Sequence, residues 1–274
     1  MARKIISWFR LVGEAITVSL SLNVDVKYVS KNPLTKKLWI FIFEEVKRKS
    51  KNKIDQMNEV FESIGHLFLK SLEDSDYTDL LEYVTEAYDA NIIVWHLATE
   101  ICYNIEKNIV GDDKREFSKI LSDYMFYLLV NQSNVMSTVM GIFHERLRDT
   151  FYELEDIILG VASKDVEGAC MELFKRGAKP PSPRYPRSAV FLGIKLAMRM
   201  ESLKEKKWEV MSGVWVEMLA FAATHVKGEA HVQIYPNDKS LVIPATLVFL
   251  AGIIKNAERT VALTFSSLLV LKEW

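Results

Sequence analysis

The sequence lacks proline over a long stretch and has few glycines. No proline occurs between Pro33 and Pro180, a run of 146 residues, and the chain of 274 residues contains 11 glycines. Proline and glycine are the strongest helix breakers, and the alternation of Val and Ile that is typical of strands is scarce here. We therefore expect an all-α protein, a multi-helix bundle of about ten helices joined by short loops.

Several motifs that mark enzymes are also missing. The sequence contains no HExxH or Cys/His zinc spacing, no serine nucleophile elbow, no Walker loop and no GxGxxG fingerprint. We therefore predict no catalytic residue, no cofactor and no small-molecule substrate, and we expect a non-enzymatic protein.

Cysteine and long apolar runs are scarce. Cys102 and Cys170 have no CxxC spacing and lie within helical patterns, which is typical of reduced, buried thiols in a cytosol-like compartment. The longest uncharged run, residues 240–254, has 15 residues and contains Pro244, whereas a membrane span needs about 20. No transmembrane helix is predicted, and we expect a cytoplasmic protein.

Charge is unevenly distributed, although the net charge is only −1. Residues 1–53 contain 12 Lys/Arg and four acids, whereas residues 54–90 contain one Lys and ten acids. The basic block can bind phosphates or anionic lipid, or it can be neutralised within the fold by the acidic block, which is the interpretation we favour. No Arg/Lys stripe interleaved with exposed aromatics follows it, so nucleic acid is not an expected partner.

Apolar residues at spacings of three and four predict individual helices. One covers "LWIFIFEEVKRK", and two more cover about residues 188–203 and 206–226. Two apolar segments, residues 241–254 and 260–271, close the chain. Capping residues mark the starts of four further helices: Asp76, Asp112, Ser133 and Ser163. Glu116 is placed to close a capping box at the second of these starts, and Gly177 ends the helix that follows Ser163.

A proline-rich stretch divides the chain. Four of the seven prolines fall within residues 180–187, which predicts a loop. We expect a basic amphipathic N-terminal segment at 1–33, a helical core part at 34–179, and a C-terminal helical part at 188–274 that packs on the first to form one globular unit.

The stretch "VWHLATEIC" contains three groups that can bind a metal or take part in a reaction. On a helix, His96 and Glu100 share a face, whereas Cys102 lies about 240° from His96 and points elsewhere. Trp95 and Cys102 are therefore assigned to the core. The favoured interpretation of His96 and Glu100 is a hydrogen bond or ion pair, and the alternative is a metal site completed from another helix.

A second candidate pair is Glu217 with His225, which can share a helix face and act as a general acid and base. Trp208 and Trp215 lie on the same predicted helix, in a stripe that also contains Met and Ala. Such a stripe is usually core, and its exposed alternative is a groove for a partner protein.

The segments "IIVWHLATEICYN", "ILSDYMFYLLV" and "AVFLGIKLAMRMESLKEKKWEVMSGVWVEMLAFAATHVKGEAH" resemble, in this order, segments of a plant family known only as domain of unknown function five-nine-four. "LWIFIFEEVKRK" is similar to the segment that precedes them there. The resemblance covers about residues 35–231 and implies a plant protein with a cytosol-facing helical domain. It implies no activity. The membrane region of longer members has no counterpart here, and the sequence departs from the family pattern after His231.

These observations lead to one favoured function and two alternatives. The favoured one is a truncated, soluble member of this family that acts as a protein-protein interaction module, binding a partner or itself, as a dominant or toxic effector. The alternatives are an effector directed to mitochondria or to a membrane surface by residues 1–25, and an enzyme or metal site at one of the two His/Glu pairs. The predicted partner contacts are Trp208, Trp215, Leu241, Val242, Leu247, Phe249, Leu250, Leu268 and Leu269, and the predicted targeting or membrane-surface residues are Arg3, Lys4, Trp8, Phe9 and Arg10.

Overall fold

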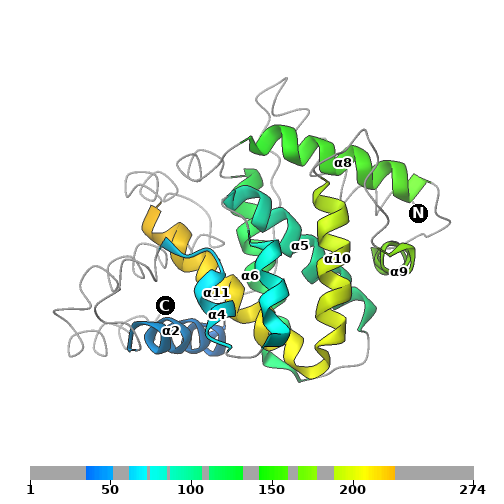
Figure 1. Ribbon diagram of the computed structural model, residues 1–274. Coiled ribbons are helices and arrows are strands. Elements are labelled where there is room, and N and C mark those ends of the chain that lie inside the picture. Colours follow the sequence, from blue (N-terminus) through cyan, green and yellow to red (C-terminus); the bar gives the residue numbers. More distant parts are fainter. Residues whose placement is uncertain are drawn as a thin grey trace.

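Every secondary-structure element that the structure describes is a helix (Figure 1). The structure is a computed structural model, and it describes residues 35–51, 62–72, 75–84, 87–106, 111–131, 142–159, 166–177 and 188–225. Of this part of the chain 89% is helical and none is strand, which confirms the all-α prediction. The predicted proline-rich loop lies outside these residues. The elements are α2 (Lys36–Lys51), α4 (His66–Lys70), the 3-10 helix η2 (Ser75–Tyr83), α5 (Tyr88–Ile105), α6 (Asp113–Asn131), α8 (Phe143–Leu159), α9 (Val166–Arg176), α10 (Ala189–Ser202), the 3-10 turn η3 (Lys204–Lys206) and α11 (Lys207–His225).

Helix α5 lies at the centre of the bundle. It packs against α6, α8, α9, α10 and η2, and its side chains from Ile92 to Cys102 are all buried. Helix α11 is also buried almost all round, and it packs against α2, α4 and α6. A helix buried on nearly every side has no solvent-facing polar face to contrast with an apolar one, which explains why α5 and α11 lack a clear hydrophobic stripe.

Three tryptophans occupy the core that α5 and α11 share. Trp95, Trp208 and Trp215 are at most 2% exposed, and each indole N–H has an acceptor. Trp95 donates to the carbonyl of Tyr83 at 2.9 Å, and Trp215 donates to the hydroxyl of Thr99 at 3.1 Å. Large aromatic rings therefore fill the interior without leaving their polar atoms unsatisfied.

Local sequence signals fix the ends of several helices. The Asp112 carboxylate accepts hydrogen bonds from the backbone N–H groups of Lys114 (2.9 Å) and Arg115 (3.2 Å), and so caps α6 as predicted. Gly177, with φ +69°, follows the last residue of α9, a conformation that favours glycine. The predicted capping box is wrong in one detail, because the Glu116 carboxylate contacts Tyr103 and Arg115.

The α-helix predicted to follow Asp76 is also wrong. Residues 75–83 form a 3-10 helix, which ends before α5 begins at Tyr88. The buried side chains of this segment are Tyr77, Leu80 and Tyr83, three residues apart. A 3-10 helix has three residues per turn, so this conformation places all three on one line facing the core.

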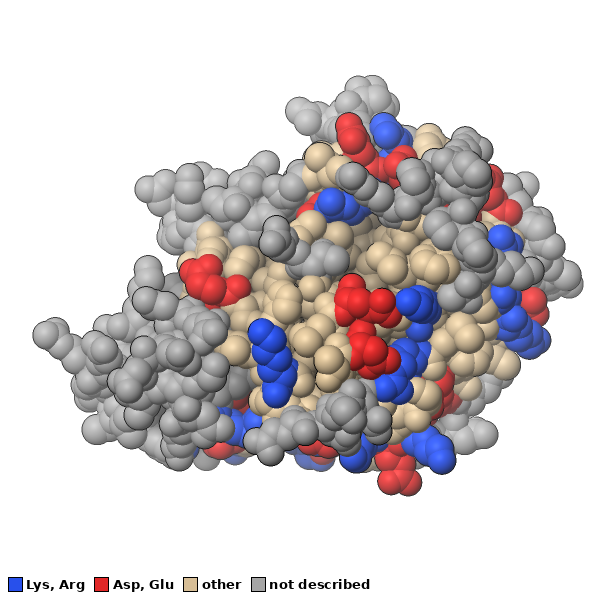
Figure 2. All heavy atoms as spheres, in the orientation of Figure 1, with Lys and Arg blue, Asp and Glu red and all other residues tan. Residues whose placement is uncertain are grey.

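Charged side chains of both signs lie beside one another on the face drawn in Figure 2. Two ion pairs join α10 to η2: Lys195 with Glu82 at 2.9 Å, and Arg199 with Asp79 at 2.5 Å. Both pairs are solvent-exposed, so each contributes only about 0–1 kcal/mol to stability. Their effect is chiefly to keep this part of the surface mixed in charge.

Candidate functional site

The His/Glu pair predicted on α5 faces a Lys/Asp pair on α6. His96 and Glu100 are four residues apart on α5, and Lys119 and Asp123 are four residues apart on α6. Since α5 and α6 pack together, this spacing brings the four side chains into one cluster. We call His96, Glu100, Lys119 and Asp123 the buried quartet.

Lys119 lies between the two carboxylates of the buried quartet. Its ammonium Nζ is 2.5 Å from Glu100 Oε1 and 2.5 Å from Asp123 Oδ1. Glu100 and Asp123 are only 4% and 5% exposed. The ion pairs are thus shielded from water, which strengthens the attraction and raises the cost of removing either partner.

Neighbouring polar groups orient the ends of the quartet. Nδ1 of His96 is 2.8 Å from the hydroxyl of Ser122, and the imidazole stacks on Phe126 with ring centroids 4.1 Å apart. The side-chain amide of Asn104 donates to Glu100 Oε2 at 3.3 Å. These contacts hold the imidazole and the Glu100 carboxylate in fixed orientations.

Burial and charge act in opposite directions on the pKa values of the quartet. Burial lowers the pKa of His96 to about 4, so the imidazole is neutral at pH 7. Burial raises the pKa of Asp123 to about 6, against the opposing charge of Lys119. Burial also acts to raise the pKa of Glu100, but Lys119, His96 and Asn104 together outweigh it and the pKa is lowered. The two carboxylates together raise the pKa of Lys119, although burial alone would lower it.

Three members of the quartet carry side-chain atoms of the types that bind metal ions. His96, Glu100 and Asp123 each offer one ligand atom, and these three atoms lie within 4.8 Å of one another. The sequence identified only the α5 half of this set, because the α6 half comes from a different segment. Cys102 takes no part, as predicted: it is buried and its Sγ is 3.7 Å from the carbonyl of Ala197 on α10.

The second predicted pair is separated in the structure. The Glu217 carboxylate accepts hydrogen bonds from the backbone N–H groups of Gly65 (2.7 Å), Leu67 (3.1 Å) and Phe68 (2.7 Å). His225 stacks on Phe221, and its Nε2 is 3.2 Å from Glu62 Oε2. Glu217 thus caps the start of α4, and the two side chains do not form the predicted acid-base pair.

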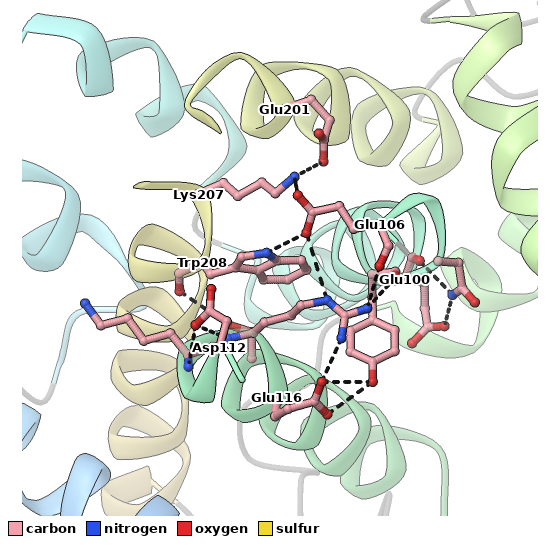
Figure 3. A network of polar contacts seen from close by, with 12 residues as sticks. Glu100, Glu106, Asp112, Glu116, Glu201, Lys207 and Trp208 are labelled. Atoms are coloured by element: carbon pink, nitrogen blue, oxygen red, sulfur yellow. Dashed lines mark hydrogen bonds and ion pairs between the residues drawn. The ribbon is translucent and has the colours of Figure 1, made fainter. Parts of the chain in front are cut away.

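A further network joins the C-terminal end of α5 to the start of α11 (Figure 3), and sequence reasoning missed it. Lys207, only 2% exposed, pairs with the carboxylates of Glu106 and, at 2.5 Å, of Glu201. Glu106 also accepts a hydrogen bond from the indole of Trp208 at 2.8 Å. The only sequence feature that indicates this network is a lysine beside a tryptophan at the start of an apolar helix. The sequence does not reveal which carboxylates the lysine pairs with.

Arg115 completes this network from α6. Its guanidinium donates to the carbonyls of Tyr103 (2.8 Å) and Glu106 (3.0 Å) at the end of α5. It also lies over the Tyr103 ring, with Cζ 3.6 Å from the ring centroid. The last carbonyls of α5 have no N–H donor within the helix, so a cation there satisfies them and complements the helix dipole.

The predicted partner contacts include two residues that the structure places in the core. Trp208 is 2% exposed and Trp215 is fully buried, so their assignment as partner contacts is wrong for this conformation and the core interpretation holds. The remaining predicted partner residues, Leu241, Val242, Leu247, Phe249, Leu250, Leu268 and Leu269, lie outside the described residues. So do the predicted targeting or membrane-surface residues Arg3, Lys4, Trp8, Phe9 and Arg10, and these assignments stay predictions.

Part of this chain matches the model of a protein family. Residues 200–234 match the family described as "Protein of unknown function, DUF594". The matching family is the one that the sequence resemblance predicted, and the plant origin stays a prediction. The DUF594 match contains Lys207, Trp208 and Glu217, three residues that link α11 to α5 and α4.

The other comparisons add no name to the DUF594 match. No curated protein and no solved structure matches the chain. Among the described helices, none has both the length and the apolar character needed to cross a bilayer.

Proposed function

We propose that this chain is a non-enzymatic helical module that binds another protein, or a second copy of itself. The observation that carries the proposal is the position of its exposed apolar side chains. The part of the chain that the structure describes has five large apolar residues with high exposure, and four of them lie on or beside α8, α9 and α10: Ile142 (51%), Tyr152 (44%), Met171 (37%) and Met198 (42%).

These three helices form one side of the bundle (Figure 1). Helix α10 packs against both α8 and α9, and a methyl group added at Gly177 would lie 3.9 Å from the sulfur of Met198. The exposed methionine of α10 thus reaches the end of α9. Methionine side chains are flexible and polarisable, and they are common on surfaces that accept protein partners.

The interior supports a structural rather than a chemical role. Lys119 is bound by Glu100 and Asp123, and Lys207 is bound by Glu106 and Glu201. These contacts hold α5, α6 and α11 in register. In this proposal the polar groups of the core keep the bundle rigid, and α8, α9 and α10 present the surface that a partner contacts.

A paired-variant binding experiment tests the proposal. Met171→Glu/Met198→Glu places two charges on the α9–α10 surface, whereas Ile40→Glu places one on α2, where Ile40 is 53% exposed. We expect the wild type and Ile40→Glu to capture the same protein from a cell extract, or to self-associate equally in sedimentation velocity. The double variant should lose that binding while its helical circular dichroism is unchanged.

Two results would overturn the proposal. One is a double variant that keeps the full set of partners and the oligomeric state of the wild type. The other is a partner lost equally from Ile40→Glu and from the double variant, because binding would then not depend on α9 and α10.

A further inference from the structure

The buried quartet contains more carboxylates than ammonium groups. Glu100 and Asp123 both face the single ammonium of Lys119, and His96 lies beside them. The two carboxylates thus share one ammonium, although the residues Glu100 and Asp123 are only 4% and 5% exposed. An uncompensated charge in the interior is costly, so a more highly charged cation has an electrostatic advantage over the ammonium.

We propose that His96, Glu100 and Asp123 form a binding site for a divalent transition-metal ion, which takes the place that the Lys119 ammonium holds in this structure. With the ammonium turned out to solvent, two carboxylates balance the two charges of the ion, and the neutral imidazole completes the donor set. One nitrogen and two oxygen ligands suit Zn²⁺, Mn²⁺ or Fe²⁺. The inference goes beyond the interaction module and does not depend on it.

The spacing of the donor atoms fits one ion. The three ligand atoms lie within 4.8 Å of one another. Two ligands on opposite sides of an ion with bonds of about 2.1 Å are about 4 Å apart. Small side-chain rotations on α5 and α6 therefore suffice to close the site, without a change in how the two helices pack.

Lys119 is the member of the quartet best placed to leave. Its side chain is 16% exposed, compared with 5% for Glu100 and 6% for Asp123. A lysine ammonium sits on a flexible four-carbon stem, and it can swing to solvent while its backbone stays in α6. The ligands are the deeper groups, and the displaceable cation is the one nearer the surface.

The surroundings of His96 select the coordinating atom. Ser122 engages Nδ1 at 2.8 Å, and the stack on Phe126 fixes the ring plane. Coordination would therefore use Nε2. Partners of this kind orient metal ligands in known sites, and their loss typically lowers metal affinity about 10- to 100-fold.

The test is a titration of the full chain, freed of metal by chelation, with Zn²⁺ and Mn²⁺ by isothermal calorimetry. We expect saturable binding of one ion, with affinity about tenfold higher or more in Lys119→Met, which removes the competing ammonium. Asp123→Asn should abolish the binding, whereas His144→Ala, at an exposed histidine of α8, should leave it unchanged. If Lys119→Met does not fold, the proposal is still tested by comparing the wild type with Asp123→Asn and His144→Ala.

The proposal is overturned if neither the wild type nor Lys119→Met shows saturable binding of metal. It is equally overturned if bound metal is retained by Asp123→Asn or is lost in His144→Ala, because the ion would then be held elsewhere. An increase in the midpoint of thermal unfolding on adding metal, seen in the wild type and absent from Asp123→Asn, provides a second readout that needs no known activity.

Discussion

Glu217 Oε2 on α11 accepts a hydrogen bond from the backbone N–H of Phe68 on α4, at 2.7 Å. The same carboxylate accepts from Gly65 and Leu67 and from the hydroxyl of Ser63. The start of a short helix has unsatisfied N–H donors and a partial positive charge, and a buried carboxylate satisfies both. Helix α4 has only five residues, so its position depends on this contact with α11.

We therefore predict that Glu217→Gln destabilises the protein by about 2–4 kcal/mol. The substitution removes the charge and turns an amide NH₂ toward backbone donors. Urea unfolding, followed by circular dichroism, measures the effect. Glu209→Gln is the matched control on the same helix, because the Glu209 side chain is 57% exposed and its change should cost less than about 0.5 kcal/mol. Equal losses in the two variants would contradict the capping role.

A second prediction concerns the contact between α11 and α4 at Gly213. A methyl group added there would lie 2.1 Å from the ring of Phe68, which is buried. We expect Gly213→Ala to destabilise the protein by about 3 kcal/mol or more, measured by urea unfolding.

Gly193→Ala on α10 provides a graded comparison for this prediction. There the added methyl group would lie 2.8 Å from Leu97 Cδ2, a milder overlap with a flexible side chain. We expect a smaller loss of about 1–2 kcal/mol. If Gly193→Ala destabilises the protein more than Gly213→Ala does, α4 shifts to accommodate the added methyl group more easily than this packing indicates.

The sequence predicted the elements that local chemistry determines. The Asp112 cap, the Gly177 terminus and the ranges of α10 and α11 follow from capping residues and apolar spacing. The 3-10 helix at 75–83 was missed, because its period depends on the core that it faces. The sequence pattern of this segment does not distinguish an α-helix from a 3-10 helix, and the packing against neighbouring helices decides between them.

The candidate site was only half predicted, for a related reason. His96 and Glu100 share a face of one helix, and helical geometry alone shows this. Lys119 and Asp123 join them only because α5 and α6 pack in one particular register. Tertiary contacts also decide that Glu217 meets the backbone of α4 rather than His225.

A third prediction concerns pH. Burial raises the pKa of Glu153, and the hydrogen bond donated by Ser188 at 2.5 Å only partly opposes it. The folded state then binds this proton more tightly than the unfolded chain does. The stability that protonated Glu153 contributes is fully present below the pKa of this group in the unfolded chain, and it is lost as pH rises through the pKa in the folded protein.

Glu153→Gln should therefore stabilise the protein relative to wild type at pH 7 and show less advantage at about pH 4, since glutamine is uncharged and still accepts from Ser188. Thermal unfolding at both pH values measures the difference. Glu145→Gln, at an exposed position of α8, controls for a general loss of surface charge. A Glu153→Gln variant that is less stable than wild type at pH 7 would show that the carboxylate is favourable there.

The last prediction separates charge from packing at Lys207. This lysine is 2% exposed and is held between Glu106 and Glu201. Lys207→Met keeps most of the side-chain volume but removes the cation between the two carboxylates, so that Glu201 loses the ammonium and, among the described residues, Glu106 keeps only the cation of Arg115, whose Nε is 3.9 Å from Glu106 Oε2. We expect Lys207→Met to lower the free energy of unfolding in urea by about 3–5 kcal/mol, against little change for Lys206→Met at the exposed neighbouring position.

Adding Glu106→Gln and Glu201→Gln to Lys207→Met should recover most of this stability, because the uncompensated charges are then gone. If the triple variant is no more stable than Lys207→Met, the lysine acts through its packing and its hydrogen bonds, and the ion pairs contribute little.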